Sequence, residues 1–277
     1  MQFIEMLKAF FIGVVQGITE WLPVSSTGHM ILFDEFLKLQ GSEEFKEMFM
    51  VVIQLGSILA VAFLYFNKLN PFSKKKSAYE KKSTLLLWAK VIVGAIPAAI
   101  IGVLLDDWFD THFYNFLVVA IALLVYGILF IIIERLRKGK EFRVETVDDL
   151  SFTDALKIGC FQVLSLIPGT SRSGSTIIGG MLSGVSRIAS AEFSFFMAIP
   201  IMLGASGLKV LKFMLSGVSI TANEIIVLII GIVVAFLVSL VAIRFLMDFV
   251  KRHSFESFGW YRIILSIVIL AYFFITK

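Results

Sequence analysis

Residues 13–30 decide how the chain is interpreted, and they read Gly-Val-Val-Gln-Gly-Ile-Thr-Glu-Trp-Leu-Pro-Val-Ser-Ser-Thr-Gly-His-Met. The stretch begins as an apolar helix in which Gln16 and Glu20, four residues apart, share one face. Pro23 lacks a backbone donor and breaks that helix, and hydroxyls and an imidazole follow it. Polar groups at membrane depth are costly unless they pair or line a cavity, so this break is predicted to be functional.

A second stretch, residues 159–176, repeats the pattern and reads Gly-Cys-Phe-Gln-Val-Leu-Ser-Leu-Ile-Pro-Gly-Thr-Ser-Arg-Ser-Gly-Ser-Thr. A one-residue gap aligns the two stretches so that Pro23 meets Pro168 and Ser26 meets Ser171. The first stretch supplies a carboxylate and an imidazole, and the second supplies a guanidinium. The two are therefore predicted to be complementary halves of one site.

Composition places the chain among helical membrane proteins. Of 277 residues, 58% are hydrophobic and 17% charged, whereas soluble domains are about 45–50% apolar and about 25% charged. The net charge of +4 comes from short basic segments, which argues against a nucleic-acid patch. One cysteine, Cys160, excludes a disulfide framework and a CxxC metal site. An all-α polytopic membrane protein forming one membrane domain, 1–277, is predicted.

Hydropathy separates broken segments from uninterrupted ones. A helix needs about 20 apolar residues to cross a bilayer. The two broken segments, 3–38 and 152–186, are predicted to be re-entrant helical hairpins, because irregular backbone is tolerated at that depth only when shielded. Six transmembrane helices are predicted at 49–66, 85–105, 113–133, 191–216, 223–247 and 258–275.

The loops between these segments predict the topology. Loop 67–83 and loop 134–151 are rich in Lys and Arg, so the positive-inside rule places them in the cytoplasm. Residues 39–48 are predicted to form a net acidic loop, and the acidic loop 106–112 suits the outer face.

Each half of the chain, 1–138 and 139–277, contains a hairpin and three spans. Three spans cross the membrane an odd number of times, so the second half begins on the opposite side from the first. The second half is therefore predicted to be inverted relative to the first. Inverted-topology repeats whose broken helices meet near the midplane are typical of transporters.

Three residues of the first stretch are candidates for catalysis or metal binding. Glu20 suits a divalent cation or a general base, and Gln16 suits a supporting carbonyl ligand. The alternatives are a structural glutamate with a basic partner and a glutamine that caps a backbone gap. His29 suits a general acid or base, or a phosphoryl-accepting nucleophile; the alternative is an interfacial histidine with satisfied hydrogen bonds.

The hydroxyl groups and arginines suit a phosphate. Ser25, Ser26 and Thr27 are candidates for a nucleophile or for oxyanion donors, with turn chemistry as the alternative. Arg172 lies in a Gly-rich turn. Its planar guanidinium and the backbone N–H groups of the turn suit a phosphate; the alternative is an arginine that marks the cytoplasmic side of the membrane. Arg262 is either an interfacial anchor beside two aromatic residues or a second phosphate ligand. The remaining substrate-binding candidates are Gly169, Thr170, Ser171, Ser173 and Thr176.

This inventory predicts a site for a diphosphate that carries a lipid tail. Cleavage of a phosphoanhydride needs charge neutralisation on the transferring group and a positioned nucleophile. A lipid or anion transporter would share the inverted repeat and remains an alternative. The phosphatidic-acid type of lipid phosphatase has His six residues after a Ser-Arg pair, but Ile178 stands at that position here.

The motifs also carry a family resemblance. Gln16-x-x-x-Glu20 with Pro23-Val-Ser-Ser-Thr-Gly-His29, and Pro168-Gly-Thr-Ser-Arg-Ser-Gly-Ser-Thr176, resemble the bacterial undecaprenyl-diphosphate phosphatases, also called bacitracin-resistance phosphatases. The resemblance covers essentially the whole chain. It implies hydrolysis of undecaprenyl diphosphate to the monophosphate and phosphate, which recycles the lipid carrier for peptidoglycan, and dependence on a divalent cation, Mg²⁺ or Ca²⁺. It also implies an inverted repeat with two re-entrant hairpins.

Position by position, the resemblance implies roles for single residues. Glu20 carries over as the essential carboxylate and Arg172 as the phosphate clamp. Ser26 and His29 carry over as the nucleophile region, with Ser26 attacking and His29 as its base, or with His29 as the nucleophile itself. Arg262 matches a family arginine implicated in the site.

The resemblance also bears on the metal, the partners and the location. Gln16 stands where some members have a second glutamate, which weakens the case for a two-carboxylate metal site. The expected partners are a polyprenyl diphosphate lipid, the membrane and, in a homodimer, a second copy of the chain, with no nucleic acid. The expected location is the bacterial cytoplasmic membrane, with the site open to the periplasmic side.

Overall fold

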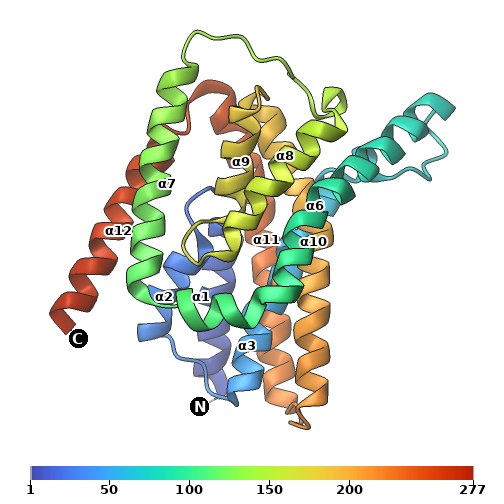
Figure 1. Ribbon diagram of the computed structural model, residues 1–277. Helices are drawn as coiled ribbons and strands as arrows, with labels where there is room; N and C mark the ends of the chain where they lie inside the picture. Colours follow the sequence, from blue (N-terminus) through green and yellow to red (C-terminus); the bar gives the residue numbers. More distant parts are fainter. Residues whose placement is uncertain (1, 277) are drawn as a thin grey trace.

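The computed structural model describes residues 2–276, apart from the side chains at positions 31, 34–36, 106, 107 and 110, and its regular elements over that range are helices (Figure 1). The helices, with two short 3₁₀ turns η1 and η2, are α1 (Gln2–Thr19), α2 (Ser26–Phe36), α3 (Glu43–Val52), α4 (Gln54–Leu64), α5 (Phe66–Leu69), α6 (Ala78–Phe113), α7 (Phe116–Arg137), η1 (Val147–Asp149), α8 (Phe152–Val163), η2 (Leu164–Leu166), α9 (Arg172–Leu182), α10 (Arg187–Leu215), α11 (Ala222–Arg252) and α12 (Glu256–Thr276).

Seven helical segments within residues 2–276 are long and apolar enough to cross a membrane. They are Gln2–Thr19, Glu43–Leu64, Ala78–Leu105, Phe116–Arg137, Arg187–Leu215, Ala222–Arg252 and Glu256–Thr276. Six of them overlap the six predicted spans, and the seventh, α1, is the first arm of the first predicted hairpin. The prediction of an all-α polytopic membrane protein is confirmed.

Three predicted loops are largely helical instead. In the predicted loop 67–83, α5 ends at Leu69 and α6 begins at Ala78. α3 begins at Glu43, inside the predicted loop 39–48, and α6 continues to Phe113, through the predicted loop 106–112. In the predicted loop 39–48, the Ser42 side chain caps α3, and the acidic residues that follow suit the positive end of the helix dipole. Hydropathy marks only the apolar part of a helix, so charged end turns were mistaken for loops.

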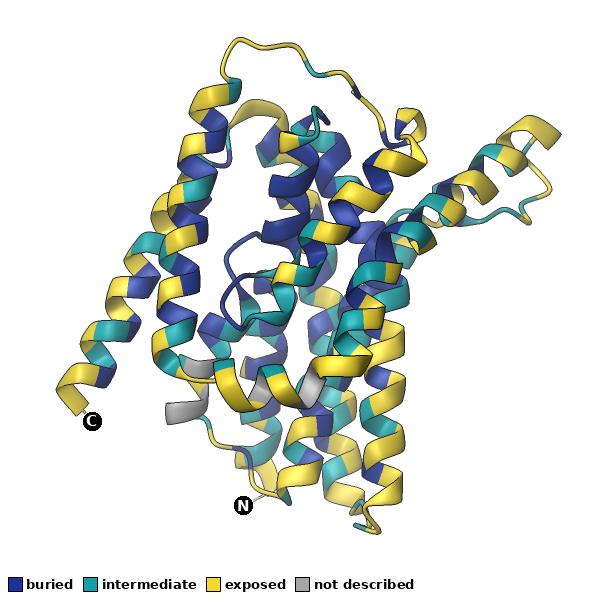
Figure 2. Cartoon of the chain, in the orientation of Figure 1, coloured by how far each residue is buried: buried dark blue, intermediate teal, exposed yellow. Residues whose placement is uncertain are grey.

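The helices pack closely where glycines let their backbones touch. A Cβ added at Gly159 of α8 would lie 2.2 Å from the Gly94 carbonyl oxygen of α6. A Cβ at Gly127 of α7 would lie 2.8 Å from the Gly259 carbonyl oxygen of α12. Small residues at such crossings are the usual means of helix association in a membrane. Figure 2 shows buried residues between the helices and exposed ones on the outer faces, as expected for a lipid-facing bundle.

The two broken segments start from opposite ends of the bundle. In Figure 1, α1 begins at the end that also holds the α10–α11 connection and the C-terminus, whereas α8 begins at the other end, after the long connection from α7. α8 is fixed at its start by a capping box between Ser151 and Asp154. The breaks after α1 and before α9 meet between these ends. The re-entrant path through a bilayer and the division into inverted repeats stay predictions.

Candidate active site

The two helix breaks share an unusual backbone conformation. Ser25 and Ser171, with φ of 72° and 73°, are the two non-glycine residues with positive φ in the described part of the chain. Each caps the helix that follows: Ser25 Oγ accepts from the Gly28 N–H at 3.2 Å, and Ser171 Oγ accepts from the Gly174 N–H at 3.1 Å. Such strain costs of order 1–3 kcal/mol and concentrates at functional sites.

This conformation corrects the predicted alignment. Ser25, rather than Ser26, is the structural counterpart of Ser171, and no gap is needed between the shared glutamines and these serines. Ser26 then corresponds to Arg172, and both are the first residue of the helix after the break. The predicted gap came from aligning Pro23 with Pro168. The residues with equivalent backbone conformation are instead the two helix caps, Ser25 and Ser171.

A buried ion pair joins the two segments. Glu20 Oε1 accepts from Arg172 Nη2 at 3.3 Å, and Glu20 Oε2 accepts from Gln16 Nε2 at 2.9 Å. Arg172 Nη1 also donates to the Ser194 carbonyl oxygen at 2.8 Å. Glu20 and Gln16 are buried, so the pair lies inside the bundle. The structure thus brings together an acid and a guanidinium that are 152 residues apart.

Two residues around Arg172 were not identified from the sequence. The guanidinium carbon lies 5.6 Å from the centre of the Trp21 ring. The Ser194 hydroxyl accepts from Thr176 Oγ1 at 2.7 Å and lies 3.2 Å from Arg172 Nη1. A tryptophan next to Glu20 could have been noticed, but a serine within an apolar span carries no signal of its own.

Backbone carbonyls at the first break hold the second segment in place. Ser173 Oγ donates to the Glu20 carbonyl oxygen at 3.2 Å and to the Leu22 carbonyl oxygen at 3.3 Å. Ser171 Oγ lies 3.2 Å from Ser173 Oγ. Thr170, Ser173 and Thr176 are buried, whereas Thr27 is half-buried. The Ser173 hydroxyl therefore contacts the backbone of the first break directly.

Arg262 ties both breaks together from α12. Its Nη1 donates to the Pro23 carbonyl oxygen at 3.2 Å, and its Nη2 donates to the carbonyl oxygens of Gly169 at 2.8 Å and Thr170 at 2.9 Å. The guanidinium carbon lies 5.5 Å from the centre of the Tyr126 ring. A single guanidinium thus fixes the turn before α9 against the turn before α2.

The interpretation of Arg262 as an interfacial anchor is wrong. Its side chain is 0% exposed, whereas Trp260 is 52% and Tyr261 is 45% exposed. All three lie within one turn of α12, and both aromatic side chains reach the surface in part, while the arginine faces the core. The sequence placed the three together but did not reveal which face each occupies.

His29 has two hydrogen-bond partners, and neither is the predicted nucleophile. Its Nδ1 lies 2.7 Å from the Ser25 carbonyl oxygen, and its Nε2 lies 2.6 Å from the Tyr261 hydroxyl. The His29 side chain is buried. In contrast to Ser25, Ser26 is half-buried, and its hydroxyl has no hydrogen bond within the described residues. Ser26 Oγ and Thr27 Oγ1 are therefore the two hydroxyls at the first break without a hydrogen bond within the described residues, and Ser26 is the one that begins α2.

Most of the polar atoms left over near the junction are hydrogen-bond donors, although the Gln162 side-chain amide, oxygen included, is also buried without a partner in the described part of the chain. Trp21 Nε1, Arg172 Nε and Arg262 Nε are buried without a partner in the described part of the chain. No group of three or more His, Cys, Asp or Glu side chains suited to a metal occurs among the described residues. Excess N–H donors beside a guanidinium suit an anion, and a metal held by protein side chains alone does not fit the site.

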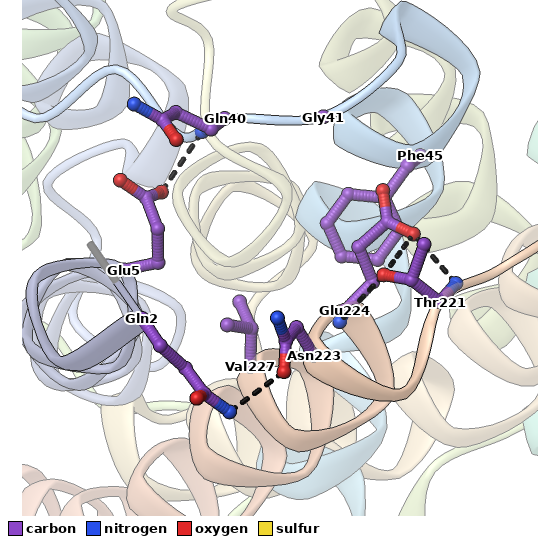
Figure 3. A pocket seen from close by; sticks show the side chains of 9 residues that line it. All are labelled: Gln2, Glu5, Gln40, Gly41, Phe45, Thr221, Asn223, Glu224 and Val227. Carbon is purple, nitrogen blue, oxygen red and sulfur yellow. Dashed lines mark hydrogen bonds between the residues drawn. The ribbon is translucent and has the colours of Figure 1, made fainter.

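A separate pocket at the ends of α1 and α11 is not a second candidate (Figure 3). Its carboxylates serve the local structure. Glu5 accepts from the Gln40 N–H at 2.8 Å, and Glu224 accepts from the N–H and the hydroxyl of Thr221, both at 2.8 Å, in a capping box. The pocket therefore stabilises the helix ends away from the two breaks.

Comparisons with known proteins agree over nearly the full length. A family model described as bacitracin resistance protein BacA matches residues 9–268. A protein of Enterococcus faecalis named undecaprenyl-diphosphatase is 55% identical over 272 residues, which are 98% of this chain and 99% of that protein. Proteins with the same name from Desulfitobacterium hafniense (55% over 274 residues; 99% and 98%) and Limosilactobacillus fermentum (54% over 270 residues; 98% of each) are similar to the same extent.

Proposed function

Since the chain belongs to the bacitracin resistance protein BacA family, we propose that it is an integral membrane phosphatase that hydrolyses undecaprenyl diphosphate to undecaprenyl phosphate and inorganic phosphate. Relatives named undecaprenyl-diphosphatase align with 98–99% of the chain at 55% identity, and seven apolar helices make the chain a multi-pass membrane protein. These relatives favour hydrolysis over a lipid or anion transporter. The reaction recycles the lipid carrier used in cell-wall synthesis.

The observation that carries this function is the ion pair between the two breaks. Glu20 and Arg172 meet where two helices begin, α2 at Ser26 and α9 at Arg172. Helix N-termini present free N–H groups and the positive end of the helix dipole, and both favour a phosphate. Half-helix N-termini serve anionic substrates in other membrane proteins. The junction therefore suits the diphosphate head of a lipid.

Arg172 is the proposed phosphate clamp. In the free protein its Nη atoms are held by Glu20 and Ser194, while its Nε has no partner within the described residues. A guanidinium that is already held in one orientation loses little conformational entropy when it binds phosphoryl oxygens. The 169–174 turn supplies backbone N–H groups beside it, and Arg262 holds that turn through two carbonyls.

Ser26 is the proposed nucleophile. Its Oγ attacks the terminal phosphorus, the bond to the bridging oxygen breaks, and undecaprenyl phosphate leaves; water then releases inorganic phosphate from Ser26. The free hydroxyl of Ser26 and its place at the start of α2 support this role, with His29 as the base. Ser25 Oγ already accepts the hydrogen bond from the Gly28 N–H, so we assign Ser25 a structural role in holding the backbone at the break. A phospho-enzyme trapped with phosphate on nitrogen would instead make His29 the nucleophile.

A divalent cation, Mg²⁺ or Ca²⁺, is the proposed cofactor. Glu20 would hold it together with the Gln16 side-chain carbonyl, because one or two carboxylates plus phosphate oxygens are typical ligands of Mg²⁺. Gln16 Nε2 donates to Glu20 Oε2 at 2.9 Å, so the Gln16 amide would have to rotate to present its carbonyl oxygen to the cation. One carboxylate fits a metal that is bound jointly with the diphosphate. When bound, the cation neutralises charge on the phosphoryl oxygens.

The proposed location is the bacterial cytoplasmic membrane, with the site opening to the periplasmic side. α1 and α2 extend from the first break toward the end of the bundle away from the Lys-rich segment 67–83, which supports access from that side (Figure 1). A homodimer is proposed as the assembly, to be tested by the mass of the detergent-solubilised protein.

Phosphate release from a prenyl diphosphate tests the function. Purified protein in detergent, without any gradient, is expected to release phosphate, and Glu20→Ala, His29→Ala and Arg172→Ala are expected to lose nearly all activity while folding. Glu47→Ala is a matched control, because Glu47 is an exposed carboxylate that pairs with Lys209. Folded wild-type protein that releases no phosphate would favour transport.

A further inference from the structure

Tyr261 contacts the imidazole of His29, and its position on α12 is fixed on both sides. Two residues earlier, Gly259 touches the α7 backbone: a Cβ there would lie 2.7 Å from the Gly127 carbonyl oxygen. The next residue, Arg262, is bound to the carbonyls of both breaks. α12 therefore cannot slide or rotate at this level without breaking those contacts, and the Tyr261 hydroxyl is held beside His29.

The hydrogen bonds of His29 define its tautomer. A carbonyl oxygen only accepts, so the Nδ1 that lies 2.7 Å from the Ser25 carbonyl carries the proton. In the neutral ring Nε2 then carries the lone pair, and the Tyr261 hydroxyl donates to it at 2.6 Å. The two rings are nearly parallel, at 9° with centroids 5.6 Å apart. Tyr261 thus contributes both a hydrogen bond and a stacking surface.

We infer that Tyr261 is a positioning residue for His29: it holds the imidazole as the Nδ1–H tautomer with Nε2 as its basic nitrogen. The inference rests on the proposed function, in which His29 takes part in phosphate transfer. The Ser25 carbonyl orients one side of the ring, and Tyr261 orients the other. Nε2 has a single lone pair, which the Tyr261 hydroxyl occupies, so this hydroxyl has to release Nε2 before the attacking group can pass its proton there.

Kinetics of Tyr261→Phe test this role. The variant removes one oxygen from a side chain that is 45% exposed, and it keeps the stacking ring. We expect kcat to fall about 10- to 100-fold, as for a misplaced catalytic group, with KM changed by less than about threefold because Tyr261 acts through His29. Trp260→Phe, on the same helix and 52% exposed, is the control and should keep wild-type kcat. An unchanged kcat in Tyr261→Phe would overturn the inference.

A double-mutant cycle shows whether Tyr261 acts through His29. In a His29→Ala background, adding Tyr261→Phe should lower the residual rate no further, because the hydroxyl has lost the group that it positions. Equal losses in both backgrounds would overturn the inference. Phosphate release by the wild type is a separate result: its absence would reject the proposed function.

The tautomer provides a readout that needs no activity. The chain has three histidines, so His112→Gln with His253→Gln leaves His29 as the single imidazole. Solid-state NMR of this variant, labelled with ¹⁵N-histidine and held in lipid, should show a proton on Nδ1 and a hydrogen-bonded Nε2. Adding Tyr261→Phe should shift the Nε2 resonance toward that of an unprotonated nitrogen without a hydrogen bond. A proton on Nε2, or an unshifted resonance, would overturn the inference.

Discussion

Substitution of Ser25 by glycine or by alanine should have opposite effects on stability. Ser25 is held at φ of 72°, where a side chain costs about 1 kcal/mol that glycine does not incur. Alanine keeps that strain and also removes the cap to Gly28, which is worth about 1 kcal/mol. Glycine removes the strain and loses only a few tenths of a kcal/mol of capping. We therefore expect Ser25→Ala to be destabilised by about 1 kcal/mol and Ser25→Gly to match or exceed the wild type.

Ser42 provides the matched control. It also caps a helix, accepting from the Phe45 N–H at 3.1 Å, but its φ is an ordinary −65°. At Ser42, glycine should be slightly destabilising, because no strain is relieved there. Thermal unfolding in detergent measures each variant, and about 1 kcal/mol corresponds to about 2 °C for a chain of this size. If Ser25→Gly unfolds at or below the midpoint of Ser25→Ala, the strain argument fails.

The same variants separate the two serines by function. Ser25→Gly retains the carbonyl that orients His29, so phosphate release should stay within a few-fold of wild type. Ser26→Ala should abolish phosphate release with a midpoint close to wild type, because the Ser26 hydroxyl has no hydrogen bond within the described residues. An active Ser26→Ala enzyme would remove Ser26 as the nucleophile.

Three further predictions follow from the junction. Glu20→Gln should destabilise the protein by about 3–5 kcal/mol, because Arg172 stays buried without a counter-charge; a thermal midpoint equal to that of the exposed control Glu47→Gln would contradict this. Arg262→Lys should cost at least about 2 kcal/mol and most of the activity, because one ammonium cannot span the carbonyls of both breaks; unfolding and phosphate release are measured together. Chelation with EDTA should abolish phosphate release, and Mg²⁺ or Ca²⁺ should restore it; full activity in excess chelator would argue against the cation.

Helix caps and hydropathy explain which parts of the fold could be predicted. The six spans and both breaks followed from apolar length and from Pro23 and Pro168, because a bilayer imposes one length on every crossing helix. The end turns of α3 and α6 could not be found in that way, because their charged residues extend beyond the apolar stretch. Local capping chemistry, which a hydropathy average ignores, decides where such helices end.

By itself the sequence determined a helical membrane bundle and two polar breaks, with Glu20 in one segment and Arg172 in the other. These are local properties, because composition, spacing and proline chemistry act within a few residues. Only the tertiary structure decided that Ser25 is the counterpart of Ser171, that Arg262 faces inward, and that Tyr261 meets His29. Those contacts join residues as much as 239 positions apart, so they depend on how whole helices cross and on the face each presents.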